Sequence, residues 1–265
     1  MKILVLGSEG MLGRYLISFF KDKFDCIGVN REMLDLTSDR KVILSQLSQL
    51  VENGDLIINS AGVIKQRNYD IVEMISVNSI LPNILNELKK NIDCKVIHIT
   101  TDCVYSGDRG LYDEDSIPDA SDEYGRSKIL GENANNMNIR TSIIGEELKN
   151  KKSLIEWVKS NQNKKILGYE NHIWNGLTCL ELCNFIHDVI KNNSYWIGTR
   201  HIHSPEDVSK YELVNIINEI YNLNIDIEKR TVDKSCYRNL RTKYNFKIYK
   251  SISEQIIEQK KFLLK

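Results

Sequence analysis

The chain lacks the features that would place it in a membrane, on a nucleic acid or around a metal ion. No apolar run approaches the roughly 20 residues of a membrane-spanning helix, and the apolar stretch near the N-terminus is too short for a signal peptide. The 36 basic and 36 acidic residues balance to zero net charge, which argues against a nucleic-acid or membrane surface. The six cysteines form no CxxC pair and the histidines show no metal-ligand spacing, so we expect no metal site and a reducing, cytoplasmic compartment.

Short apolar segments alternate with helical patterns along the 265 residues. We expect strands at 2–6, 26–30, 55–60, 95–101, 138–144 and 197–203. We expect helices near 11–21, 38–52, 70–91, 124–136 and 178–192, with Pro82 kinking the third of them. This alternation predicts an α/β fold, a Rossmann-type doubly wound parallel sheet. Residues 1–148 and about 177–204 are expected to form it, and 149–176 and 205–265, with helices at 207–222 and 251–264, a smaller C-terminal lobe.

A glycine-rich turn lies between the first expected strand and the first helix. Glycines let a backbone turn tightly and approach a pyrophosphate, while a helix N-terminus offers free N–H groups and a partial positive charge. The sequence therefore predicts a dinucleotide cradle, although the glycine spacing of three and three differs from the commonest fingerprint. The residues of this cradle are Gly7, Glu9, Gly10, Met11, Leu12 and Gly13.

Arg31 follows the second expected strand, at the position that distinguishes the two nicotinamide dinucleotides. An acidic residue there binds the ribose hydroxyls, whereas a guanidinium accommodates the 2′-phosphate. Arg31 after Asn30 therefore favours NADP(H), and NAD(H) is the alternative because Glu32 is adjacent. Asp35 and Leu36 are expected beside the adenine.

Tyr124 and Lys128 are four residues apart on an expected helix and therefore share one face. A neighbouring ammonium stabilises a phenolate, so we expect it to lower the pKa of Tyr124 from about 10 toward neutrality. Thr101 ends the strand expected at 95–101, where its hydroxyl faces the cleft and can hold a carbonyl oxygen beside the phenol.

These blocks occur in an order that resembles the extended short-chain dehydrogenase/reductase family, and within it the dTDP-4-dehydrorhamnose reductase branch. The resemblance covers nearly the whole chain, is strong over residues 1–145 and weakens beyond about 205. The segments that carry it are Thr101-Asp102-Cys103-Val104-Tyr105-Ser106-Gly107, Tyr124-Gly125-Arg126-Ser127-Lys128, Leu130-Gly131-Glu132 and Arg140-Thr141-Ser142.

The resemblance implies a Thr101/Tyr124/Lys128 catalytic triad. It also implies that Asn78 supports the site and that Ala61, Gly62 and Thr141 line the cofactor. The implied reaction is NADPH-dependent reduction, at C4, of a UDP- or dTDP-linked 4-keto-6-deoxyhexose that carries a hydroxyl or an acetamido group at C2. The product would be a rhamnose-type sugar nucleotide.

Cys103 supports a second hypothesis for the enzyme, a bifunctional epimerase/reductase. Related bifunctional epimerase/reductases carry an acid/base cysteine two residues after the catalytic threonine, and the second group of such a 3-epimerase would be Lys152 or Lys151. The alternative is that Cys103 is a small buried residue. A hypothesis outside the enzymes is a non-catalytic, NADP-binding regulatory subunit. The intact triad argues against it.

The smaller lobe offers candidates for the sugar-nucleotide substrate. Trp157 and Trp174 can stack on a base or sugar, and Arg238 and Arg241 lie where the branch uses basic residues to clamp a diphosphate. The alternative hypothesis is that these tryptophans belong to the core and these arginines are solvated. We also expect a homodimer formed through the helices near 70–91 and 124–136.

Overall fold

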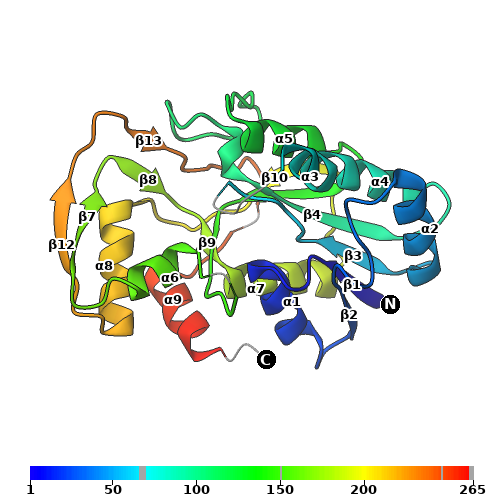
Figure 1. Ribbon diagram of the computed structural model, residues 1–265, viewed down its shortest axis with the longest axis horizontal. Helices are drawn as coiled ribbons and strands as arrows, with labels where there is room; N and C mark the ends of the chain where they lie inside the picture. The colour runs from blue at the N-terminus through cyan, green and yellow to red at the C-terminus, as the bar shows by residue number, and fades with distance from the viewer. Residues whose placement is uncertain (66–69, 150, 246, 263–265) are drawn as a thin grey trace.

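A six-stranded parallel sheet forms the centre of the computed structural model (Figure 1), which describes residues 1–265 except 66–69, 150, 246 and 263–265. The strand order is β10-β5-β4-β3-β1-β2. The bounds are β1 Lys2–Leu6, β2 Asp25–Val29, β3 Leu56–Asn59, β4 Lys95–Thr101, β5 Met137–Thr141 and β10 Gly198–His201. The order reverses between β1 and β3, and this is where a doubly wound sheet opens a crevice beyond its carboxyl ends.

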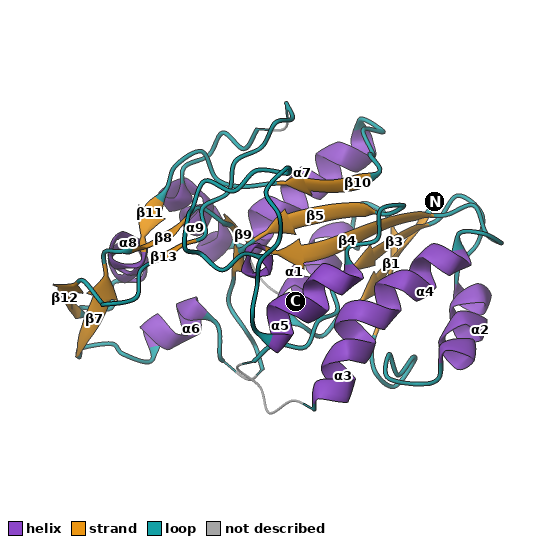
Figure 2. Ribbon diagram, turned by 90° about the horizontal axis from the view of Figure 1, so that it is seen from above, coloured by secondary structure: helices purple, strands orange, loops and turns teal. Residues whose placement is uncertain are grey.

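Helices cover both faces of this sheet (Figure 2). Ile3 and Val5 of β1 pack with α1 (Met11–Phe20) and α7 (Cys179–Lys191) on one face. Leu4 and Leu6 pack on the other, with α2 (Arg40–Leu50) and α4 (Leu81–Leu88). Alternate side chains of one strand thus enter different cores, which is why a strand buried on both faces is uninterruptedly apolar.

Short strands and three helices make up the other end of the molecule, at the left of Figure 1. Two small sheets have the orders β11-β8-β13 and β12-β7, and β6 pairs with β9. The strands are β6 Ile143–Ile144, β7 Lys165–Tyr169, β8 His172–Trp174, β9 Leu177–Thr178, β11 Val208–Ser209, β12 Asp226–Arg230 and β13 Cys236–Tyr237. The helices are α6 Leu154–Lys159, α8 Lys210–Tyr221 and α9 Ile252–Lys261.

Ser209 and Ser251 begin α8 and α9 with capping boxes, each accepting from a backbone N–H and paired with a glutamate three residues on. Helix α9 returns to the main body, where Gln255 Oε1 accepts the N–H of Thr178 at 3.1 Å and Gln259 Oε1 accepts the N–H of Leu180 at 3.2 Å. These buried amides satisfy backbone donors at the start of α7 that have no partner within their own helix.

A π-helical turn interrupts the helix expected at 70–91. The segment consists of α3 (Ile71–Ile75), the π-helical turn η1 (Ser76–Ile80) and α4. The wide turn precedes Pro82, which lacks the N–H that would bond to the carbonyl of Asn78 four residues earlier. That carbonyl meets Gly131, where an added Cβ would lie 2.1 Å from its oxygen, so α5 packs directly against the turn.

Three other expected elements are shorter than the pattern suggested or are divided. The helix expected at 124–136 is α5, Glu123–Gly131, because Glu132 leaves the helical conformation. The strand expected at 138–144 is divided between β5 and β6 at Ser142. The helix expected at 251–264 is α9, and the last residues of that range lie outside the described ones. No helix in the described ranges has the length and apolar character needed to cross a membrane.

Candidate active site

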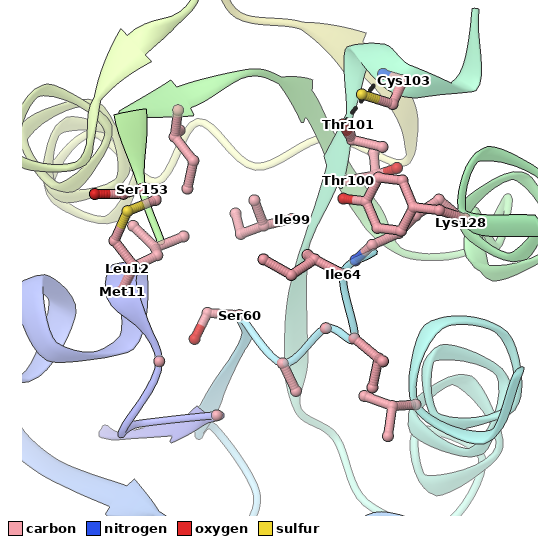
Figure 3. Close-up of a pocket in the computed structure, with 18 of the residues that line it drawn as sticks. Met11, Leu12, Ser60, Ile64, Ile99, Thr100, Thr101, Cys103, Lys128 and Ser153 are labelled. Carbon is pink, nitrogen blue, oxygen red and sulfur yellow. Dashed lines mark hydrogen bonds between the residues drawn. The ribbon is translucent and has the colours of Figure 1, made fainter. Parts of the chain in front are cut away.

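A cavity of about 690 Å³ opens at the carboxyl ends of the central strands. Met11 and Leu12 lie on one side of it, and Thr101, Cys103 and Lys128 lie on the opposite side (Figure 3). Predicted residues that line it are Gly7, Glu9, Gly10, Met11, Leu12, Asn30, Arg31, Leu36, Ala61, Gly62, Thr101, Cys103, Tyr124, Lys128, Thr141, Lys152 and Arg238. Predicted residues outside its lining are Gly13, Asp35, Asn78, Trp157, Trp174 and Arg241.

The glycine-rich turn has the shape that a pyrophosphate cradle needs. Gly7 has a φ of +75°, and a Cβ there would lie 2.7 Å from the Cα of Ala61. A Cβ on Gly13 would lie 2.1 Å from the Gly7 carbonyl oxygen, so α1 can approach the turn only with glycine at this position. Helix α1 has no side-chain cap at Gly10 and no acidic residue in its first turn, which leaves its N-terminal N–H groups suited to an anion.

Glu9, within the turn, points its carboxylate toward cations. It lies 3.2 Å from the Lys149 ammonium and 3.8 Å from the Arg14 guanidinium. The only acidic residue of the turn is therefore charge-compensated, and the described residues fit a dinucleotide.

Arg31 is placed at the end of β2, where its guanidinium faces two carboxylates. Its Nη1 lies 3.4 Å from Glu73 Oε1, and its Nε lies 3.8 Å from Asp35 Oδ1. Asp35 turns toward Thr37, whose N–H and hydroxyl it accepts at 3.0 and 2.7 Å. These hydrogen bonds lower the pKa of Asp35.

Asn78 lies in the π-helical turn and links it to the loop after β3 and to α5. Its side chain exchanges two hydrogen bonds of 2.9 Å with the backbone of Val63 and donates to Ser127 Oγ at 3.0 Å. The loop after β3 is thereby fixed to α5. Gly62 in that loop lies so close to Lys128 that an added Cβ would be 3.1 Å from Nζ.

Thr101, Tyr124 and Lys128 meet on one wall of the cavity. Thr101 ends β4, while Asp122 caps α5 by accepting the N–H of Gly125 at 2.8 Å and so orients Tyr124 and Lys128. The Thr101 hydroxyl acts on the phenol and opposes the rise of its pKa. Burial lowers the pKa of Lys128 to about 8.

The expected lowering of the Tyr124 pKa is wrong for this structure. Burial of the phenol raises its pKa, and Cys103 and Asp102 raise it further, while the Thr101 hydroxyl lowers it. Desolvation of the phenolate therefore outweighs the stabilising contacts. Tyr124 is thus a neutral phenol at pH 7, the form that can donate a proton.

Cys103 lies beside the triad under a guanidinium. Arg238 Nη1 is 3.4 Å from the thiol sulfur, and Arg238 Nε donates to the Tyr105 carbonyl at 3.1 Å. Burial and the Asp102 carboxylate raise the pKa of Cys103 to about 12, although Arg238 opposes them. The thiol is protonated at neutral pH.

A buried network of charged residues packs next to the triad. Glu132 follows Lys128 by one helical turn and accepts from Thr100 Oγ1 at 2.8 Å and from Arg140 Nε at 2.9 Å. Arg140 also reaches His201 Nε2 at 3.0 Å. The network joins α5 to the carboxyl ends of β4, β5 and β10, the elements that position the triad.

The remaining candidates lie around the rim or farther away. The cavity lining includes Lys152, whose N–H donates to Glu147. Trp157 is 43% exposed on α6, and Trp174 packs against the core of the smaller lobe. Arg241 forms a salt bridge of 2.7 Å with Asp207.

Several lining residues gave no signal in the sequence. Glu73 and Glu147 enter the cavity from a short helix and a loop that no motif marks. Asp102 has no predicted role of its own, yet it is buried and accepts from the Thr101 hydroxyl at 3.2 Å. Ser142 lies next to Thr141 at the break between β5 and β6, which the pattern did not reveal.

Comparisons with known proteins agree with this geometry. The family model described as "RmlD substrate binding domain" matches residues 1–229. The dTDP-4-dehydrorhamnose reductase of Mycolicibacterium smegmatis is 29% identical over 50% of this chain and 41% of its own length. The spore coat polysaccharide biosynthesis protein SpsK of Bacillus subtilis is 28% identical over 54% and 51%. The chain thus spans about half the length of the curated relatives it matches.

Solved structures show the same fold at low identity. A dTDP-4-dehydrorhamnose reductase from Clostridium acetobutylicum superposes with a TM-score of 0.85 at 19% identity, covering 98% of this chain and 99% of that one. The Bacillus anthracis dTDP-4-dehydrorhamnose reductase in complex with NADP gives 0.80 at 21% identity, covering 97% and 98%. The Bordetella bronchiseptica enzyme WbmG in complex with NAD gives 0.79 at 15%, covering 98% and 93%.

Proposed function

Because the chain belongs to the RmlD substrate-binding-domain family of extended short-chain dehydrogenases/reductases, we propose that it is an NADPH-dependent reductase of a nucleotide-linked 4-keto-6-deoxyhexose. The observation that carries the proposal is that Thr101, Tyr124 and Lys128 line the same cavity as the glycine-rich turn. The similarity to reductases of dTDP-4-dehydrorhamnose supports a dTDP-linked sugar reduced at C4, and a UDP-linked sugar is the alternative.

The cradle at Gly7, the turn at Ala61 and Arg31 would hold the dinucleotide, with NADP(H) preferred and NAD(H) accepted. When bound, a reduced nicotinamide supplies the electron pair that reduces a ketone. The guanidinium of Arg31 supports the preference because it can pair with a phosphate. The complexes of similar proteins with NADP and with NAD support the same range.

Tyr124 would act as the general acid. Its neutral phenol donates a proton to the oxygen of the substrate carbonyl as negative charge develops there. Thr101 holds that oxygen by a second hydrogen bond, and the ammonium of Lys128 stabilises the phenolate that remains. Each group therefore acts on charge that appears only during the reaction, the requirement for lowering a barrier.

Arg238 is the proposed contact to the sugar nucleotide. It lines the cavity next to Cys103, and a guanidinium suits the paired hydrogen bonds of a diphosphate. Trp157, Trp174 and Arg241 remain predictions, since their side chains would have to turn toward the cavity. Free cysteines and a small-molecule substrate fit our proposal of a cytoplasmic enzyme.

A homodimer would cover an apolar face on α3, η1 and α5. Val72, Ile75, Ile80 and Leu130 are 64%, 40%, 44% and 67% exposed there. Exposed apolar side chains gathered on one face are typical of an interface. Light scattering should give twice the chain mass, and Leu130→Glu should give a monomer.

Turnover with a panel of substrates tests the main proposal. NADPH oxidation is followed with UDP-, dTDP- and GDP-linked 4-keto-6-deoxy sugars, with and without a 2-acetamido group. Tyr124→Phe should reduce turnover by about 10²–10⁴-fold, the usual contribution of a general acid, while NADPH binding is retained. Tyr249→Phe, at an 86% exposed tyrosine, is the matched control. Binding without turnover by the unaltered protein would indicate a regulatory subunit instead.

A bifunctional 3-epimerase/4-reductase is the second candidate, because Cys103 and Lys152 both line the cavity. The protonated thiol would return a proton to the carbon next to the ketone, and Lys152 would remove one from the other face of the ring. Incubation with a keto-sugar in deuterated buffer should then label that carbon, and Cys103→Ala should abolish the labelling. Reduction without any label would leave a plain reductase.

A further inference from the structure

Glu73 is an acidic side chain in the half of the cavity that would hold the adenosine of the cofactor. It lies in the first turn of α3, far in sequence from the glycine-rich turn and from β2. Its carboxylate lines the same cavity as Arg31 and lies 3.4 Å from the guanidinium. It is thus positioned where the 2′ substituent of the ribose is recognised, opposite the arginine expected to recognise it.

The two carboxylates near Arg31 differ in how they are held. Asp35 is engaged by the N–H and hydroxyl of Thr37 and lies 3.8 Å from Arg31. In the described part of the chain, the Glu73 carboxylate has Arg31 as its one hydrogen-bonding partner. Glu73 is therefore free to exchange that partner for a ligand, whereas Asp35 is not.

We propose that Glu73 is a cofactor-specificity residue, which competes with a 2′-phosphate for Arg31 and accepts the 2′-hydroxyl when the phosphate is absent. The inference rests on the proposed function, since it assumes a nicotinamide dinucleotide in this cavity. Cofactor choice is then divided between two elements, a guanidinium after β2 and a carboxylate on α3. The chain would bind both dinucleotides and prefer NADPH less strongly than Arg31 alone would allow.

Electrostatics give the direction of the effect. A phosphate monoester carries a charge of about −1.5 to −2 at pH 7, so a carboxylate beside it is repelled and its ion pair with Arg31 must open. A ribose hydroxyl carries no charge and donates a hydrogen bond that a carboxylate accepts. Removing the charge of Glu73 should thus favour NADPH and leave NADH unchanged or weaker.

Direct titration of both reduced cofactors onto the full chain tests this, without substrate or turnover. Glu73→Gln keeps the size of the side chain and removes its charge. Its NADPH dissociation constant should fall by about two- to fivefold, the range that an exposed ion pair supports, while that for NADH stays the same or rises. Because the competing interaction is ionic, the NADPH gain should shrink in high salt.

Two further variants make the result decisive. Glu87→Gln breaks an exposed pair with Arg40 outside the cavity and should leave both constants unchanged. In an Arg31→Ala background, the Glu73→Gln gain for NADPH should be smaller. Equal changes for both cofactors, or none, would overturn the role of Glu73 while leaving the reductase proposal intact. Failure of the unaltered chain to bind either cofactor would overturn both.

Discussion

Replacing Lys128 by methionine should stabilise the folded protein at neutral pH while removing its reductase activity. The Lys128 residue is 5% exposed, and in the described part of the chain its ammonium forms no hydrogen bond or ion pair. Burial lowers its pKa from the ordinary value of 10.5 to about 8. The folded state therefore holds the charge at a disadvantage that the unfolded chain does not share.

The size of this effect follows from the two pKa values. One pKa unit corresponds to about 1.4 kcal/mol, so a decrease from 10.5 to about 8 destabilises the folded protein by about 3 kcal/mol at pH 7. Between pH 8 and 10.5 the unfolded state binds the proton and the folded state does not. The free energy of unfolding of the unaltered protein gains this contribution as pH rises through that window. Methionine fills a similar volume without the charge, so the variant should have this contribution to its free energy of unfolding at every pH.

Urea unfolding of both proteins at pH 7 and pH 10 measures the contribution. Lys128→Met should be more stable by up to about 3 kcal/mol at pH 7, and the difference should approach zero at pH 10. Taking the difference cancels the titration of the cysteines, which the two proteins share. The exposed Lys90→Met is the matched control and should show no pH-dependent difference. A variant that is equally or less stable at both pH values would refute the reasoning.

Three other measurements address the cradle, the C-terminal helix and the sheet. Gly13→Ala should abolish cofactor binding in titrations or lower the free energy of unfolding by about 1–3 kcal/mol. Gly10→Ala should have a milder effect, because an added Cβ there would lie 3.2 Å from the nearest atom. Equal effects of the two variants would contradict the close approach of Gly13 to the Gly7 carbonyl. Gln255→Leu should lower the unfolding free energy by about 1–3 kcal/mol, because the N–H of Thr178 loses its acceptor, and an unchanged urea midpoint would argue against that role. Burial lowers the pKa of His98 to about 3, so the unfolded chain binds a proton below pH 6.5 that the folded protein does not. Acidification from pH 6.5 to pH 5 should therefore lower the free energy of unfolding by about 2 kcal/mol, and His98→Asn should lose this pH dependence. An unchanged dependence of the unfolding free energy on pH in the variant would exclude His98 as the cause.

Local patterns predicted the strands and the first helix well. The expected strands at 2–6 and 95–101 have the observed bounds, because runs of buried apolar residues are typical of a parallel sheet covered on both faces. The internal structure of the smaller lobe does not follow from the sequence, because residues 149–176 and 205–265 do not continue the alternation of strands and helices. Its strands pair over two to five residues with segments far away in the chain, and such short pairings have no periodicity to read.

The candidate site was predictable where residue types occur in a fixed local order. Tyr124 and Lys128 share a helix, so their common face follows from helical geometry alone. The same reasoning gave the wrong sign for the pKa of Tyr124, because burial depends on how α5 packs against η1 and β4. Glu73 was missed since its only relation to Arg31 is across space.

The sequence by itself determined the alternating α/β order, the glycine-rich turn and the helical face that carries Tyr124 and Lys128. These depend on near neighbours, whose spacing and backbone freedom are fixed by the covalent chain. Only the tertiary structure decided which charges are desolvated, that Arg238 lies over Cys103, and that Glu73 faces Arg31. Such pairings depend on the crossing of distant elements, and desolvation depends on everything packed around a group, so no local pattern contains them.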